Sequence, residues 1–181
     1  MKTRDLAYIA VCAALHAVSS WLAVPIGAIP VTLQTLVVCL AAGLLGWQRG
    51  FLSTLVYLLL GFVGVPVFSG FTGGAFVLLS PTGGYLIGFL FIPLSMGAFL
   101  PWAKRETGAK RILPYALGAV LGLLCCYAFG TLWCVLGVSG EAAGLVAAIS
   151  ACVLPYLPFD AAKIALAVLL IIKLKKYIKT E

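Results

Sequence analysis

The sequence predicts an all-α integral membrane protein, built as a bundle of six transmembrane helices. Of the 181 residues, 64% are hydrophobic and only 9% are charged, whereas soluble proteins are roughly one half apolar. Residues 51–103 contain no Asp, Glu, Lys or Arg at all. A helical span needs only about 20 apolar residues. That one stretch is therefore long enough to cross a bilayer twice.

Uncharged runs predict where the spans lie. They give six segments, at residues 6–24, 31–48, 51–65, 84–102, 112–137 and 156–173. A further apolar run, 142–154, reaches only about 20 Å as a helix, which is too short to cross. We expect it to be a partly inserted helix, after which Pro155 and Pro158 restart the chain. No linker or repeat divides the sequence, so one membrane domain is expected over residues 1–181.

The positive charges predict the orientation, because cytoplasmic loops of membrane proteins collect Lys and Arg. Eleven of the twelve cations fall on one side of the predicted spans: Lys2, Arg4, Arg49, Lys104, Arg105, Lys110, Arg111, Lys173, Lys175, Lys176 and Lys179. The connections on the other side hold no cation and one acid, Glu141. Both termini are therefore predicted to be cytoplasmic, in a multi-pass protein of the cell membrane, expected to be bacterial. The net charge of +7 comes from these clusters and not from a nucleic-acid-binding stripe.

Several catalytic classes are disfavoured by motifs that the sequence lacks. It has no GxxxxGK[ST] phosphate loop and no HExxH zinc motif, so neither an ATPase of that type nor a zinc protease is expected. The six cysteines lie in apolar runs without CxxC spacing, which indicates packing residues. We predict neither enzymatic activity nor a metal or cofactor.

One short pattern, residues 137–140, matches the GxSG serine motif of rhomboid-type intramembrane proteases. The only histidine, His16, is predicted near the middle of the first span, while Ser139 is predicted at the outer end of the fifth. A nucleophile and its base must lie within hydrogen-bond reach. The pattern is therefore interpreted as a turn, and a hydrolase remains an alternative.

Two ionisable residues at the start of the last span are the strongest candidates for a binding site. Ionisable groups inside a bilayer are costly and mark function by default. Asp160 and Lys163 are three residues apart, so they share one helical face just after Pro158. An ammonium at a helix start suits a ligand carboxylate, while Asp accepts from a ligand N–H. The alternative is an internal ion pair that only neutralises two charges.

Two uncharged segments carry further candidate binding residues. The connection from Pro66 to Gly84 is rich in glycine, hydroxyl groups and aromatic rings, so it is expected to fold back over an apolar cavity. A buried structural loop is the alternative. In the segment IPVTLQT, residues 29–35, Thr32 and Gln34 could orient a ligand or form interhelical hydrogen bonds.

Small residues mark one face of the first span. Ala10 and Ala14, with Ala13 and Ala17 beside them, form small-xxx-small steps. Such steps allow another helix to approach closely. Ala10 and Ala14 are therefore predicted to dock a partner helix.

Four segments in order, IPVTLQT, GVPVFSGFTGG, LSPTGGYLIGF and PFDAAKIALA, make the chain resemble the biotin-binding subunit, of the BioY type, of energy-coupling-factor (ECF) transporters. The resemblance covers most of the chain. It implies a compact six-helix subunit with a ligand cavity near the extracellular face, closed by the loops between spans one and two and between spans three and four.

The resemblance also implies residue roles and partners. Asp160 and Lys163 would bind biotin, and the loop before PTGGY, with Thr72, Gly73 and Gly74, would add contacts. Gln34 and Tyr85 are further substrate-binding candidates. Some family members have an arginine after GGY to bind the carboxylate of biotin, whereas this chain has Leu86. The expected partners are a transmembrane coupling subunit and two ATPase subunits that use ATP, with membrane lipid around the protein.

Two other functions stay open at this point. The same complementary groups would suit another small vitamin, in which case the chain would be a capture subunit with a different ligand. A solitary secondary transporter or channel, in which Asp160 and Lys163 relay protons, is the other possibility.

Overall fold

The structure is a computed structural model that describes residues 3–25, 30–138 and 142–175. Within these residues the regular secondary structure is helical, and two isolated β-bridges lie in the connections. The long helices are α1 (Thr3–Trp21), α2 (Gln34–Leu45), α3 (Trp47–Phe62), α6 (Phe91–Arg105), α7 (Ile112–Val138) and α9 (Leu157–Leu174). The shorter ones are η1 (Ser69–Phe71), α4 (Ala75–Leu79), α5 (Gly83–Gly88), η2 (Gly108–Arg111) and α8 (Ala142–Cys152). An all-helical fold was predicted, and the structure confirms it.

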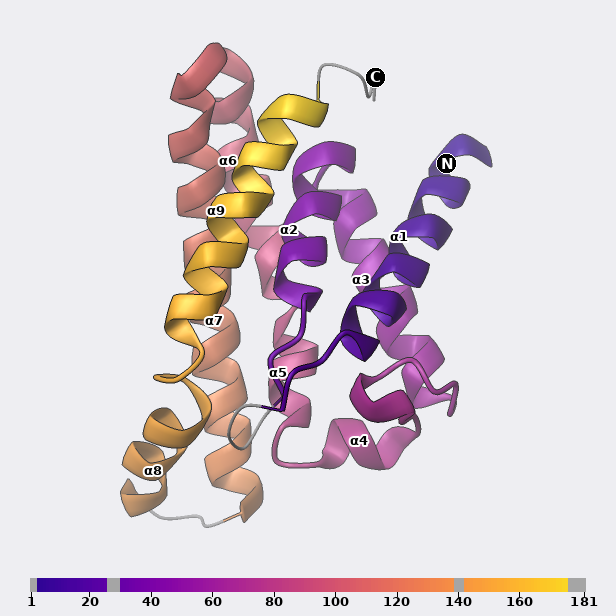
Figure 1. The fold of residues 1–181 in the computed structure, drawn as a ribbon, viewed down its shortest axis with the longest axis vertical. Coiled ribbons are helices and arrows are strands. Elements are labelled where there is room, and N and C mark those ends of the chain that lie inside the picture. Colours follow the sequence, from indigo (N-terminus) through magenta and orange to yellow (C-terminus); the bar gives the residue numbers. More distant parts are fainter. Residues whose placement is uncertain (1–2, 26–29, 139–141, 176–181) are drawn as a thin grey trace.

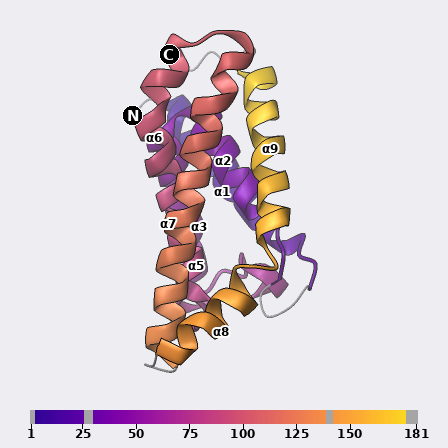
Figure 2. The same cartoon turned by 90° about the vertical axis from the view of Figure 1, so that its left-hand side faces the viewer.

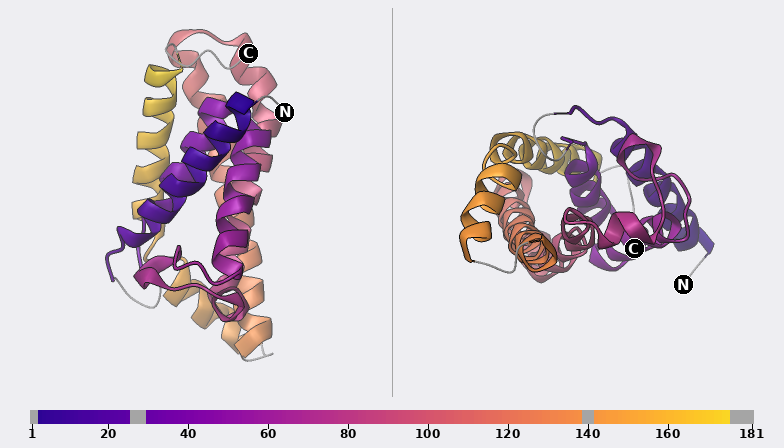
Figure 3. Two further views of the ribbon diagram at one scale, coloured as in Figure 1. Left: turned by 90° about the vertical axis from the view of Figure 1, so that its right-hand side faces the viewer. Right: turned by 90° about the horizontal axis from the view of Figure 1, so that it is seen from below.

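The helices run along one long axis (Figure 1). The start of α1, the end of α9 and the connection between α6 and α7 lie at one end, while α4 and α8 lie at the other (Figures 1 and 3). Figure 2 shows α8 turning across the lower end of α7, with α9 rising beside α7. The molecule therefore has two distinct ends, one formed by cationic segments and one by short helices and loops.

Two apolar cores hold the helices together. The larger joins α2, α6, α7 and α9 through side chains such as Val38, Ile92, Ala119 and Ile171. The smaller joins α1 and α3 to the loop that follows α3, through Ala13, Ala17, Tyr57, Leu58, Val67 and Phe68. Small residues allow the close approach: a Cβ on Gly43 would lie 2.3 Å from Cδ1 of Ile171, so a larger residue would force the side chain of Ile171 to move where α2 meets α9.

The six predicted spans coincide with α1, α2, α3, the pair α5 and α6, α7 and α9. By length and composition, Gly83–Arg105 and Gly108–Gly137 could each cross a membrane, while Gln34–Leu45 and Trp47–Val63 are shorter apolar helices. The run 142–154, predicted to be a short helix, forms α8.

Helix ends differ from the prediction where backbone geometry decides them. Gly46 has φ +91°, so the chain passes from α2 to α3 within one residue, and Arg49 lies in the first turn of α3 instead of in a loop. The helix α2 starts at Gln34 and not at residue 31, because Val31 pairs with Val24 in an antiparallel bridge.

Candidate ligand-binding site

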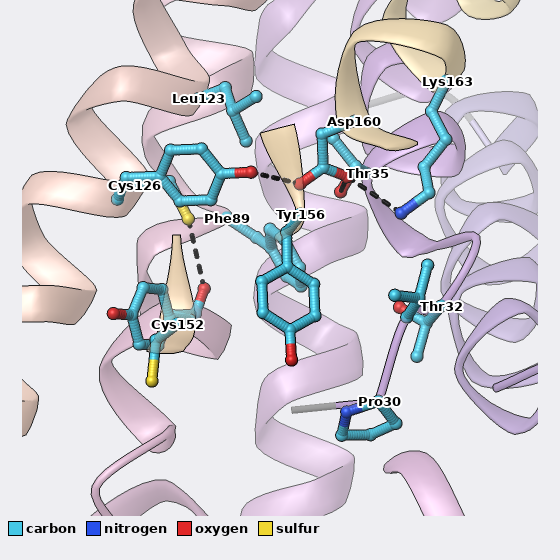
Figure 4. Close-up of a pocket in the computed structure, with 13 residues that line it drawn as sticks. Pro30, Thr32, Thr35, Phe89, Leu123, Cys126, Cys152, Tyr156, Asp160 and Lys163 are labelled. Atoms are coloured by element: carbon cyan, nitrogen blue, oxygen red, sulfur yellow. Dashed lines mark hydrogen bonds and ion pairs between the residues drawn. The ribbon is translucent and has the colours of Figure 1, made fainter. Parts of the chain in front are cut away.

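Asp160 is the centre of a buried hydrogen-bond network at the start of α9 (Figure 4). Its Oδ1 accepts from Lys163 Nζ at 2.8 Å and from Thr35 Oγ1 at 3.1 Å. Its Oδ2 accepts from the hydroxyl of Tyr127 at 2.5 Å. These partners come from α9, α2 and α7, so the carboxylate ties three helices together. The predicted spacing of Asp160 and Lys163 thus produces a real ion pair.

The Asp160 network leaves bonding capacity for a ligand. A carboxylate has about four lone-pair sites, and three are used here. The ammonium of Lys163 has three donors, of which one is used for Asp160. Because the two charges neutralise each other, their burial is less costly than that of a lone ion. The pair is internal, as expected if it only neutralised two charges, and part of its hydrogen-bonding capacity is not used by the described residues.

A cavity of ≈ 70 Å³ adjoins this network. Asp160, Lys163, Thr35 and Tyr127 all line it (Figure 4). Its other lining residues combine hydroxyl groups, aromatic rings, aliphatic carbon and thiols: Pro30, Val31, Thr32, Tyr85, Phe89, Leu123, Cys126, Cys152 and Tyr156. The cavity therefore has an ion pair on one side, while its other walls are mostly apolar and aromatic with a few hydroxyl groups, as in small-molecule sites.

A neighbouring cavity of ≈ 260 Å³ shares Pro30, Thr32, Tyr85 and Phe89 with the first. It extends under the connection that follows α3, and is completed by Gln34, Phe68, Ser69, Thr72, Val77, Thr82 and Leu86. Because the two spaces share these walls, we treat them as two compartments of one ligand cavity. Their combined volume lies just above the roughly 300 Å³ at which ligand pockets of proteins begin.

Gln34, Thr72 and Tyr85, which the sequence predicts as binding residues, line this ligand cavity. Gln34 is buried and donates from Nε2 to the hydroxyl of Tyr57 at 2.6 Å. Tyr85 bonds through its hydroxyl to Thr131 Oγ1 at 3.0 Å, and Thr72 donates to the carbonyl of Ser69 at 3.0 Å.

Gly73 and Gly74 were also predicted to bind the substrate, but they do not appear among the described lining residues of the cavity. They shape the loop instead. A Cβ on Gly73 would lie 2.3 Å from the carbonyl oxygen of Val65, so only glycine fits there. Gly74 has φ +110° and donates its N–H to the carbonyl of Gly61 at 2.6 Å. Both positions therefore fold the connection back against the end of α3.

The same connection is anchored to the end of α1. Ser20 Oγ donates to the carbonyl of Val67 at 2.5 Å, and Trp21 Nε1 donates to that of Pro66 at 3.0 Å. The Trp21 ring also stacks on Phe71, with centroids 5.0 Å apart. Phe71 holds φ +56°, which is strained for a residue other than glycine. The connection is thus a fixed cover beside the cavity and not a free loop.

In the smaller compartment, sequence reasoning missed three residues with hydroxyl groups, Thr35, Tyr127 and Tyr156. Thr35 is part of the segment IPVTLQT, but it was not singled out from Thr32 and Gln34. Tyr127 lies within the span predicted over residues 112–137. A tyrosine hydroxyl in the middle of an apolar helix needs a partner, and this was the available signal for Tyr127.

The predicted docking residues Ala10 and Ala14 are exposed on α1, away from the ligand cavity. Their neighbours Ala13 and Ala17 are buried against the rest of the molecule. The outward face of α1 also carries exposed Leu6, Val11, Leu15 and Val18. Ala10 and Ala14 therefore face outward, where another helix or lipid can reach them.

The components of the hydrolase alternative are not brought together in the described residues. Ser139 lies outside them. His16 is buried between α1 and α3, where its Nε2 is 3.3 Å from Thr54 Oγ1 and its ring lies 5.6 Å from that of Tyr57. The histidine is accounted for by this packing and hydrogen bond.

Comparison with known proteins matches this architecture to one family. The sequence profile of the BioY family matches residues 1–180. Biotin transporter BioY of Thermotoga maritima is 39% identical over 176 residues, which are 96% of each chain. Biotin transporter BioY2 of Lactococcus lactis is 46% identical over 132 residues, 73% of this chain and 70% of that protein. The chain belongs to the BioY family.

A solved structure supports the BioY assignment at the level of the fold. The crystal structure at 2.1 Å of the S-component for biotin from an ECF-type ABC transporter superposes with a TM-score of 0.82. It is 29% identical and is matched over 97% of this chain and 95% of that one. The relatives of this BioY-family chain are named transporters, so the hydrolase alternative is not favoured.

Proposed function

We propose that this chain captures biotin as the substrate-binding subunit of an ECF-type transporter. The observation that carries the proposal is the Asp160 network, which places a carboxylate, an ammonium and hydroxyl groups on one wall of an otherwise largely apolar cavity. Biotin has complementary parts: a ureido ring with two N–H donors and a carbonyl, an apolar thiophane ring and chain, and an anionic tail. Membership of the BioY family favours biotin over other vitamins with similar groups.

Particular atoms of the site suit particular parts of biotin. The remaining lone pair of Asp160 suits a ureido N–H, while the hydroxyl groups of Thr35 and Tyr127 keep the carboxylate oriented. The donors of Lys163 that bond to no other described residue suit an anion. Leu86 lines the second compartment at the position where some family members carry an arginine, so Lys163 and backbone N–H groups are the proposed carboxylate partners.

The proposed arrangement is one membrane domain over residues 1–181, with six spans, cytoplasmic termini and the ligand cavity toward the outside. The distribution of cations supports this orientation: the start of α1, the α6 to α7 connection and the end of α9 share one end of the molecule (Figure 1). The ligand cavity lies toward the other end, beside the connections before α2 and α5.

Transport needs an energy source that this chain is not expected to provide itself. We propose that it associates with a transmembrane coupling subunit and two ATPase subunits, because a related S-component comes from an ECF-type ABC transporter. The exposed Ala10 and Ala14 on α1 are the proposed contact for the coupling subunit.

Calorimetric titration of the purified protein with biotin tests the proposal. Asp160→Asn and Lys163→Ala should each weaken binding at least tenfold, since hydrogen bonds to charged groups contribute roughly 1.5–3 kcal/mol. Lys173→Ala is the matched control, because this lysine lies on the same helix and does not line the cavity. Absence of biotin binding in a folded sample, or equal affinity of all three variants, would contradict the proposed function.

A further inference from the structure

A second cavity, separate from the ligand cavity, lies at the end of the molecule where α2 turns into α3 and where α6 and α9 end. Its volume is ≈ 360 Å³. One wall is apolar and consists of Leu44, Leu45 and Leu100. The rim is basic, with Arg49 from α3, Lys104 from the last turn of α6 and Lys175 from the end of α9. We call this space the basic cavity.

The positive charge of the basic cavity is only partly balanced. Arg49 is paired with Asp5, with Nη2 and Oδ1 2.9 Å apart. Lys104, by contrast, forms no ion pair within the described part of the chain, and none of the described lining residues is an acid. Lys175 donates to two neutral acceptors, the carbonyl of Gly43 and the hydroxyl of Tyr115. Among the described residues, therefore, two lysines face the cavity without a negative charge opposite them.

The electrostatic environment of Lys175 also favours an anion in the basic cavity. Burial lowers the pKa of its ammonium below the usual range, and the nearby charges of Arg111 and Lys104 lower it further. Cations that repel one another in a half-buried position are stabilised by an anion placed between them. The larger apolar core fixes the ends of the helices that carry Lys104 and Lys175, so the backbones of the two lysines stay close to one another.

Two tryptophans near the basic cavity fit the membrane boundary that the proposed orientation places at this end. Trp47 lines it and Trp102 lies on the same helix as Lys104, and both indole rings are partly exposed. Tryptophan is enriched at the boundary between hydrocarbon and water. In the proposed orientation this end faces the cytoplasmic leaflet, which carries the anionic lipids.

We propose that the basic cavity binds the phosphate headgroup of an anionic phospholipid. Lys104 and Lys175 bind the phosphate oxygens, and the leucine wall packs against the apolar part of the same lipid. Basic pockets between helices on the cytoplasmic side are typical sites for such headgroups. A free phosphate ion offers the same charge but nothing for Leu44, Leu45 and Leu100 to contact, which favours the lipid.

Lipid retention by the purified full-length protein tests this inference. Native mass spectrometry in detergent would compare phosphatidylglycerol with phosphatidylcholine of the same acyl chains. The unaltered protein should retain phosphatidylglycerol preferentially, and Lys104→Gln should lower that retention about fivefold, the effect of one surface cation on an anionic lipid. Lys173→Gln is the matched control, because this exposed lysine also lies near the cytoplasmic end but does not line the basic cavity.

Further measurements separate the alternatives. Lys104 forms no ion pair with another described residue, so Lys104→Gln removes no such contact. Lys175→Gln, by contrast, removes a hydrogen bond to the end of α2, so a thermal melt accompanies this variant. Equal retention of the two lipids, or equal effects of Lys104→Gln and Lys173→Gln, would overturn the inference. The inference would also be overturned if Lys104→Gln lowered the binding of inorganic phosphate but not the retention of phosphatidylglycerol. The same holds if Lys104→Gln abolished association with the coupling subunit and left lipid retention unchanged. Biotin titration of the same samples measures the proposed function separately, so a failure of lipid binding can be distinguished from a failure of biotin binding.

Discussion

The amide of Gln34 and the hydroxyl of Tyr57 are joined by a hydrogen bond of 2.6 Å, which links the ligand cavity to α3. The ring of Tyr57 also packs against two other rings. It meets Phe68 edge-on, with centroids 5.5 Å apart and planes at 85°, and it packs against His16 of α1. A residue of the cavity wall is thus connected through one tyrosine to the helix that carries Ala10 and Ala14.

Tyr57→Phe should weaken biotin binding and lower the melting temperature. The variant keeps the ring contacts but leaves the buried amide of Gln34 without this partner, which costs roughly 1–3 kcal/mol. Titration calorimetry and thermal melting in detergent check this. Tyr8→Phe, near the start of α1 and away from the ligand cavity, is the control and should change neither quantity. Unchanged affinity of Tyr57→Phe would mean that Gln34 does not need this bond in order to bind the ligand.

Tyr127→Phe should raise the dissociation constant for biotin about tenfold. The hydroxyl of Tyr127 donates to Oδ2 of Asp160, and a hydrogen bond to a charged group contributes roughly 1.5–3 kcal/mol. Thr35→Val removes the bond to the other oxygen with little change in shape and should have a smaller effect, because Lys163 still donates to Oδ1. If both variants bind as the unaltered protein does, the orientation of Asp160 does not limit affinity.

Charge and hydropathy were enough to predict the helical fold, the positions of the six long apolar segments and the short helix α8. They succeed because a charge-free run can be satisfied in a bilayer only as a helix. They also marked Asp160 and Lys163, since ionisable groups are rare in such runs. The structure adds that this pair lies in the wall of a cavity.

The rest of the site depends on contacts between distant segments. Thr35 and Tyr127 reach Asp160 across separations of 125 and 33 residues, and no local spacing encodes such a meeting. The helix ends were missed for a similar reason: the turn at Gly46 and the bridge between Val24 and Val31 depend on backbone geometry and on pairing, which hydropathy does not describe.

Ala14→Trp should leave biotin binding intact and abolish uptake by cells that contain the ECF partners. The alanine is exposed on α1 and does not line the ligand cavity, while an indole there would hold a partner helix away. Leu15→Trp is the matched control: Leu15 is also exposed on α1 but is already large, so uptake should largely persist. Uptake of labelled biotin and calorimetry on the purified variants provide the two measurements. Equal loss of binding and uptake in Ala14→Trp would count against a docking role.

Gly73→Ala should loosen the connection that covers the ligand cavity. The added methyl group would lie 2.3 Å from the carbonyl oxygen of Val65, which belongs to the backbone and can move only if the loop moves. Overpacking of this kind costs about 1–3 kcal/mol. Since Thr72 lines the cavity directly beside Gly73, the displaced loop should also bind biotin less tightly.

Gly137→Ala provides the comparison for Gly73→Ala, because a Cβ at Gly137 meets nothing within 4 Å and alanine favours the helix α7. Melting temperature and biotin affinity measured on both variants separate loop packing from a general effect of replacing glycine. A Gly73→Ala protein that melts and binds like Gly137→Ala would show that the loop adjusts freely. In that event the tight packing against Val65 would not be what holds the cover over the cavity.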